Sequence, residues 1–229
     1  MNLIFKNWRR FQLNEIFNSP VPDDEIEVTM DASWGTNWMF FVNDLPYEME
    51  IAEFYGADGE HPILKEWGVE FSHKGEYDQT DYGLDTGVVV MSTVLKILMD
   101  WIKENNNNFF FLKSSSKEEI RTRLYNRLLK NVSKKLGTDY VAENVGAMFG
   151  GMQMIVNIGL IERKVDEFIK DSDFRGARKL IADALTKLNV NGFKEGRSVQ
   201  RIIKIFDKVE QSQVGKGRGW RMREGNEKQ

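Results

Sequence analysis

Residues 86–104 read TGVVVMSTVLKILMDWIKE, and this stretch decides the fold. Its apolar side chains recur at i, i+3, i+4 and i+7, the spacing of a helix that buries one face. This stripe consists of Val90, Met91, Val94, Leu95, Leu98, Trp101 and Ile102. The pattern predicts a helix at the centre of a domain, with Asp85 or Thr86 capping its first turn.

The segment before this helix has a period of two instead. Four runs between residues 26 and 73 alternate apolar with polar side chains and are rich in aromatic and β-branched residues, which predicts an antiparallel meander. In the third run, Glu48 and Glu50 share one face and Met49 the other. Such alternation is typical of a sheet that has one face in water.

The segment after the helix extends the same predicted domain. The run FFFL at 109–112 is wholly apolar and predicts a strand buried on both faces. Ser116 and Glu119 have the spacing of a capping box, and they predict a second helix that ends before Gly137. The fold class is therefore α/β in the α+β sense, with a mostly antiparallel sheet and two packed helices, followed by a helical C-terminal region.

Helical periodicity dominates the rest of the chain, with helices expected at roughly 142–169, 173–189 and 197–211. The last residues are rich in glycine and charge and cannot bury a core. The predicted organisation is an amphipathic segment at 1–17, a linker at 18–25, the α/β domain at 26–140, the helical region at 141–212 and a basic, glycine-rich tail at 213–229.

Composition excludes several classes of function. None of the 229 residues is cysteine, so disulfides, thiolate nucleophiles and cysteine metal sites are all ruled out. The net charge of −3 is too small to attract a polyanion to the whole molecule, so any such attraction must come from local patches. Lys6 and Arg9 interrupt the opening residues, which predicts no export signal. The apolar stretch 145–161 is short for a membrane span, and none is expected.

Motifs for common enzyme chemistry are missing from the sequence. It has no Walker loop, nucleophile elbow or dinucleotide fingerprint, and His61 and His73 stand alone. The acidic loop 75–87 could hold calcium or magnesium, but it does not follow the EF-hand order of ligands. A solvated loop is the simpler interpretation, and no metal is expected.

Basic side chains gather on the second helix and on the tail. A solvated basic face is one interpretation, and contact with an anion or a nucleic acid is the other, with bases stacking on the tryptophan of the tail. The candidate contact residues are Lys113, Lys117, Arg121, Arg127, Lys130, Arg218, Trp220, Arg221 and Arg223. In the opening segment, Ile4, Trp8 and Phe11 share a helical face with Phe5 beside them, and this face either packs back on the domain or docks on a partner.

Two family resemblances follow from these residues. The opening segment and the span from Tyr47 to Gly137 look like uncharacterised proteins of tailed bacteriophages. The order of strands, glycine loop, helix, strand and helix is similar to the GNAT acyltransferase fold. That resemblance implies that Gly83 and Gly87 flank acyl-CoA and that Tyr125 protonates the leaving thiolate. The glycine spacing departs from the family motif, and the carboxylates of the loop oppose an anionic cofactor.

The sequence therefore favours a non-enzymatic, phage-encoded binding protein, virion-associated or host-directed, over an enzyme. Its expected partners are another phage or host protein, or nucleic acid, and an oligomer is compatible with the sequence. The expected location is the host cytoplasm or the virion, without secretion. One alternative is an acyl-CoA-dependent N-acyltransferase, for which acetyl-CoA would be the cofactor; otherwise none is expected. The other is a sequence-independent nucleic-acid-binding protein.

Overall fold

A computed structural model describes residues 19–54, 62–73, 84–106, 108–109, 112–113, 129–144, 153–190 and 192–226. Its contacts divide the chain into two units. The first unit takes its described residues from 1–55, 66–106 and 112–114, and the second takes them from 56–65, 107–111 and 115–229. Each unit is treated separately below.

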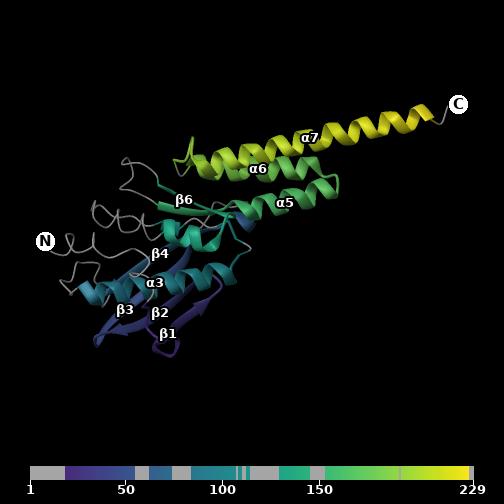
Figure 1. The fold of residues 1–229 in the computed structure, drawn as a ribbon. Helices are drawn as coiled ribbons and strands as arrows, with labels where there is room; N and C mark the ends of the chain where they lie inside the picture. Colours follow the sequence, from purple (N-terminus) through teal and green to yellow (C-terminus); the bar gives the residue numbers. More distant parts are fainter. Residues whose placement is uncertain are drawn as a thin grey trace. The chain divides into compact units, whose positions relative to one another are not determined.

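The first unit is built on a sheet whose strands follow one another in chain order (Figure 1). The antiparallel strands are β1 (Ile26–Ala32), β2 (Gly35–Val42), β3 (Leu45–Phe54) and β4 (Glu66–His73). The short strand β5 (Leu112–Lys113) then pairs in parallel with β4. The predicted fold class, with its mostly antiparallel sheet, is confirmed.

The two faces of the sheet differ as the alternation predicts. Met49 and Ile51 are fully buried on one face, whereas Glu48 on the other face is exposed. On the buried face, the rings of Phe40 and Tyr47 stack with their centroids 5.7 Å apart. Apolar burial on one side of the meander therefore sets its register, because a slip of one residue would bring the glutamates into the core.

Helix α3 (Leu84–Glu104) is the predicted central helix, and it begins two residues earlier than expected. Asp85 and Thr86 consequently lie inside its first turn, and their predicted capping role is wrong. The Thr86 hydroxyl accepts a hydrogen bond from Asn43 Nδ2 at 2.7 Å. Residues 90–95 are all buried, so the helix is enclosed on every side there instead of burying a single stripe.

The residues before β1 contact α3 through a hydrogen bond and an ion pair. The amide of Val21 donates to Thr93 Oγ1 at 3.0 Å, and Asp23 pairs with Lys96. The hydrogen bond with Asp23 raises the pKa of Lys96, helped by the charge of Asp100 and opposed by burial. The described part of the predicted linker 18–25 therefore has defined contacts, including a single 3-10 turn at Asp23–Glu25.

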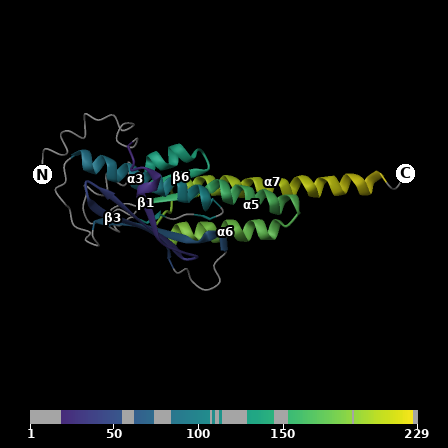
Figure 2. The same ribbon diagram turned by 90° about the horizontal axis from the view of Figure 1, so that it is seen from below.

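The second unit combines a hairpin with three long helices. The hairpin consists of β6 (Tyr140–Asn144) and β7 (Gln153–Asn157). The helices α5 (Ile158–Lys170), α6 (Phe174–Val190) and α7 (Arg197–Asn226) lie side by side in both ribbon views (Figures 1 and 2). The helical C-terminal region is confirmed, but the helix expected at 142–169 is wrong at the described residues 142–144 and 153–157, which are strand. Strands form there because a β-branched run, Ile155 and Val156, pairs with Val141 and Ala142.

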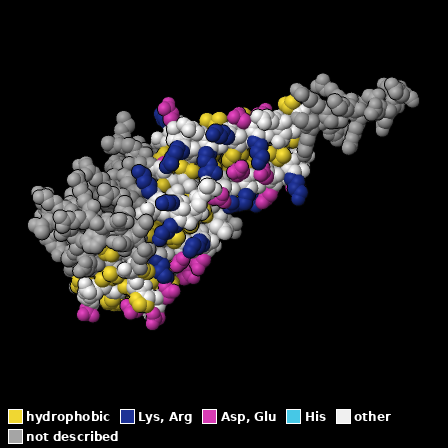
Figure 3. Space-filling view, in the orientation of Figure 1, with side chains coloured by type: hydrophobic (Ala, Val, Ile, Leu, Met, Phe, Trp, Pro, Cys, Tyr) yellow, Lys and Arg dark blue, Asp and Glu magenta, His cyan; other side chains and the backbone are white. Residues whose placement is uncertain are grey.

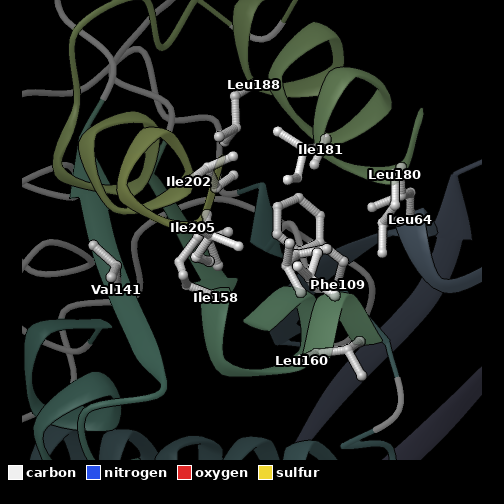
Figure 4. Packing of buried hydrophobic residues seen from close by; sticks show 14 of the residues in the cluster. Leu64, Phe109, Val141, Ile158, Leu160, Leu180, Ile181, Leu188, Ile202 and Ile205 are labelled. Atoms are coloured by element: carbon white, nitrogen blue, oxygen red, sulfur yellow. The ribbon is translucent and has the colours of Figure 1, made fainter. Parts of the chain in front are cut away.

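The core of the second unit contains two side chains from the segment that the sequence pattern assigned to the α/β domain at 26–140. Leu64 and Phe109 come from segments between elements of the first unit, and both are buried among Ile158, Leu180 and Ile181 (Figure 4). The Phe109 amide also donates to Ile63 O at 2.6 Å. The predicted strand 109–112 is therefore wrong at Phe109; of that run, the structure describes strand only at Leu112.

Residues 129–136 form the described end of the predicted second helix. They belong to the second unit, although the sequence pattern grouped them with residues 26–140. Ser133 explains this placement in part, because its hydroxyl donates to Tyr140 O on β6 at 2.9 Å.

Helix α7 continues well past the expected end of residue 211 and through the predicted tail as far as Asn226. Lys208 pairs with Asp166 of α5 at 2.7 Å, and Glu210 pairs with Arg178 of α6 at 2.8 Å. The hydrogen bond with Glu210 raises the pKa of Arg178. Once a helix is anchored in this way, each added residue costs little, and no proline follows to stop it. No helix in the described ranges combines the length and apolar character needed to cross a bilayer.

Exchanging two glycines for alanine tests the geometry of the first unit. A Cβ at Gly87 in α3 would meet no atom of the described residues within 4 Å. We expect Gly87→Ala to raise the free energy of unfolding by about 0.5–1 kcal/mol, because alanine favours the helix. A Cβ at Gly35 would lie 3.0 Å from Ile51 O and 3.2 Å from Ala52 Cβ. We therefore expect Gly35→Ala to lower the free energy of unfolding by about 1–3 kcal/mol, because the added methyl group has no room. Urea titrations followed by circular dichroism measure both, and the opposite order would contradict the packing.

Candidate functional site

The second unit contains an open cavity of about 410 Å³. It lies where helix 129–136, strand β6 and the start of α7 come together. The described residues that line it are the apolar Leu129, Ala142 and Phe193, the glycine Gly196, and the charged Lys130, Glu143, Glu195 and Arg197. Half of these described residues are charged, so the cavity is more polar than the usual small-molecule site, whose lining is mostly apolar.

The carboxylate of Glu143 holds the start of α7. Its Oε1 accepts a hydrogen bond from the Ser198 amide at 2.9 Å, and negative charge is favourable at the N-terminus of a helix. A Cβ on Gly196 would lie 2.5 Å from Glu143 Oε2 and 2.6 Å from Oε1, so only glycine permits this approach. The charge of Glu143 is thereby engaged by the helix amides. Its Oε2 is buried and has no hydrogen-bond partner among the described residues.

Two arginines of α7 bind backbone carbonyls at and just before β6. Arg197 Nη2 donates to Ala142 O at 2.6 Å, and Arg201 Nη1 donates to Thr138 O. These side-chain donors occupy groups that another strand could otherwise use, which is a common way to protect a strand edge. Both carbonyls are uncharged, so the positive charges of the two arginines are not cancelled.

A row of cations follows one face of α7 from the cavity outward. Its members, Arg197, Arg201, Lys204 and Lys208, have the i, i+4, i+7, i+11 spacing that places residues on one helix face. We call this set the α7 cation row. Lys130 and Lys134 are exposed one turn apart on helix 129–136, and Lys130 shares the cavity with Arg197. Figure 3 shows Lys and Arg side chains gathered over this unit, with fewer Asp and Glu side chains among them.

Acidic groups balance only part of this charge. Lys208 is paired with Asp166, and both side chains remain about half exposed, at 46% and 49%. Lys130 and Lys204 have no ion-pair partner in the part of the chain that the structure describes. Near β6, burial raises the pKa of Tyr140, whose hydroxyl accepts a hydrogen bond from Asn157 Nδ2 at 3.4 Å. Tyr140 is therefore held in its neutral form.

The candidate residues chosen from the sequence have different outcomes. Lys130 is exposed and lines the cavity, and Gly87 lies in the first turn of α3. Lys113 belongs to β5, but its side chain is outside the description. Arg218, Trp220, Arg221 and Arg223 belong to the last turns of α7, of which only the backbone is described. The candidates that lie outside the described residues are Phe5, Trp8, Phe11, Gly83, Lys117, Arg121, Tyr125 and Arg127.

Sequence reasoning missed the α7 cation row and Glu143. The row could have been found, because its spacing is visible once residues 197–211 are predicted to be helical. The role of Glu143 could not have been found in this way, because its hydrogen-bond partner Ser198 is 55 residues away along the chain. In the described ranges, no three His, Asp or Glu side chains gather in a way that could hold a metal ion.

Comparisons with protein-family models, with curated proteins and with solved structures found no match for this chain. Function is therefore argued from the contacts and charges of the second unit.

Removing the carboxylate of Glu143 tests its hold on α7. We expect Glu143→Ala to lower the free energy of unfolding by about 1–2 kcal/mol, because the Ser198 amide loses its acceptor. Glu143→Gln keeps an acceptor and loses only the charge, so its cost should be about 0.5–1 kcal/mol. Glu195→Ala, at an exposed carboxylate of the same cavity, is the control and should cost less than about 0.5 kcal/mol. Equal losses at Glu143 and Glu195 in urea titrations would contradict the capping role.

Proposed function

We propose that this chain is a phage-encoded, non-enzymatic binding protein whose C-terminal unit contacts nucleic acid through the α7 cation row and Lys130. The observation that carries the proposal is the continuous row of four cations, which begins at a cavity that Lys130 also lines. Cations spaced along one element neutralise successive phosphates without reading the sequence.

The contacts of the row leave it able to bind phosphate. A guanidinium has five N–H donors, so Arg197 keeps donors beyond the one that its carbonyl partner uses. The pair between Lys208 and Asp166 is too exposed to be strong, and a phosphate can replace the carboxylate. Lys204 is exposed and has no described partner to lose.

The same helix carries further positive charge beyond the row. Residues 215–226 read GKGRGWRMREGN, in which four of the residues are basic and one is acidic. Because α7 continues to Asn226, these basic residues belong to the same helix as the row. Trp220 adds a ring on which an unpaired base could stack.

Neutralising two cations of this surface tests the proposal. We expect the full chain to bind fluorescein-labelled single-stranded DNA, with an affinity that falls steeply as salt rises. Lys130→Gln with Lys204→Gln should weaken binding and reduce the slope of log K against log salt by about 1–2. Fluorescence anisotropy at several salt concentrations gives both quantities.

A matched control comes from α6. Arg175 and Lys179 are exposed and have no described partner, so Arg175→Gln with Lys179→Gln removes the same charge away from the row. This double variant should bind as the unchanged chain does. Binding without salt dependence, or equal effects of the two double variants, would rule the proposed surface out. Mass spectrometry of purified virions separates a virion component from a protein of the host cytoplasm.

An N-acyltransferase is a second candidate, supported by one feature of the first unit. Strand β4 is followed by α3 and then by β5, which is the one parallel pairing among the described strands. This order agrees with the resemblance to the GNAT fold, and the first turn of α3 is where that resemblance would place acyl-CoA. Among the described residues, no atom lies within 4 Å of a Cβ built on Gly87.

Acetyl-CoA distinguishes the second candidate from the first. If the chain is an acyltransferase, millimolar acetyl-CoA should raise the melting temperature of the full chain, because a ligand of the native state stabilises it. Gly87→Ala should then reduce that rise while leaving the fold intact. A melting temperature that does not change in acetyl-CoA would exclude this candidate.

A further inference from the structure

We propose that the cavity of the second unit receives one unpaired nucleotide of a bound strand and prefers a base that carries an exocyclic amino group. This inference rests on the proposed nucleic-acid function and names the form of nucleic acid that the site takes. Its observations are the volume of the cavity, its apolar wall, and the placement of cations and carboxylates around that wall.

The walls of the cavity suit the parts of a nucleotide. Leu129, Ala142 and Phe193 provide an apolar surface for the flat face of a base. Lys130 and Arg197 line the same cavity and can hold the phosphate, with Lys130 acting as a point charge and Arg197 through its remaining N–H donors. A volume of about 410 Å³ lies in the range of small-ligand sites.

The carboxylates at the cavity give it a preference among bases. Glu143 Oε1 is held by the Ser198 amide and Oε2 is buried, so Glu143 contributes negative charge to this wall without offering Oε2 to a base. Glu195 is exposed at the same cavity and has no described partner, so it is the carboxylate that can accept a hydrogen bond from a base. Carboxylates accept from the amino group of cytosine. In thymine, the only N–H of the pairing edge lies between two carbonyl oxygens, which a carboxylate repels.

The cavity should also bind a single strand in preference to a duplex. A paired base is stacked in the helix, and its amino group is already hydrogen-bonded to its partner. To enter the cavity it must leave the stack, and an enzyme that flips a base must supply that cost. In a single strand no base pair is broken and less stacking is lost, so the cavity favours unpaired nucleotides.

Binding of oligo(dC), oligo(dT) and a duplex of equal length to the full chain tests this inference. We expect oligo(dC) to bind about tenfold more tightly than oligo(dT), and the duplex to bind more weakly than oligo(dC). Glu195→Gln removes an exposed carboxylate without touching the core and should reduce the preference for oligo(dC) while leaving the salt slope unchanged. Ala142→Met fills the cavity from β6 and should have the same effect. Cytidine monophosphate should compete with oligo(dC) for the unchanged chain.

The outcomes separate this inference from the proposed function. Equal, salt-dependent binding of oligo(dC) and oligo(dT) would overturn the cavity's role and leave the α7 cation row standing. Duplex binding as tight as that of oligo(dC) would overturn it as well. If none of the nucleic acids binds, both the inference and the proposed function fail. A preference for oligo(dC) that survives both variants would place the selective site elsewhere.

Discussion

The hydrogen bond from the Ser198 amide to Glu143 Oε1 joins the start of α7 to strand β6. Arg197 adds a second link between these two elements, and Arg201 binds Thr138 O just before β6. Together these contacts determine where α7 begins and which of its faces lies toward β6. The position of the cation row and the shape of the cavity both depend on that placement. Glu143 therefore has a structural role, because its carboxylate accepts from an amide at the positive end of α7.

Local patterns predicted the elements whose burial follows a simple period. The position of helix α3 and the alternation of Glu48 with Met49 follow from spacing alone, although α3 is buried on more than the one predicted face. Elements whose structure depends on distant partners were not predictable in this way. Phe109 is fully buried with helices that come much later in the chain, and nothing in the run FFFL indicates that. The hairpin β6–β7 is a similar case, since its short strands are stabilised by helices packed against it.

The same distinction applies to the candidate site. Lys130 was recognised because cations cluster along the predicted second helix, and it does line the cavity. Its neighbours Arg197 and Glu143 come from other elements, so their proximity to Lys130 depends on the tertiary fold. Arg201, Lys204 and Lys208 needed only the helical spacing of residues 197–211. The sequence predicts too short an α7 because four glycines follow Val214 and indicate a weak helix, whereas the ion pairs to α5 and α6 that anchor the helix lie before them.

We propose that nucleic acid lies along the start of α7 and along helix 129–136. Hydrogen–deuterium exchange of the full chain, with and without a saturating single-stranded oligonucleotide, tests it most directly. We expect the amides of residues 129–136 and 192–208 to exchange more slowly when the oligonucleotide is bound, and those of α6 to exchange at an unchanged rate. Protection confined to β1–β4, or an unchanged exchange pattern under conditions where anisotropy shows binding, would contradict it.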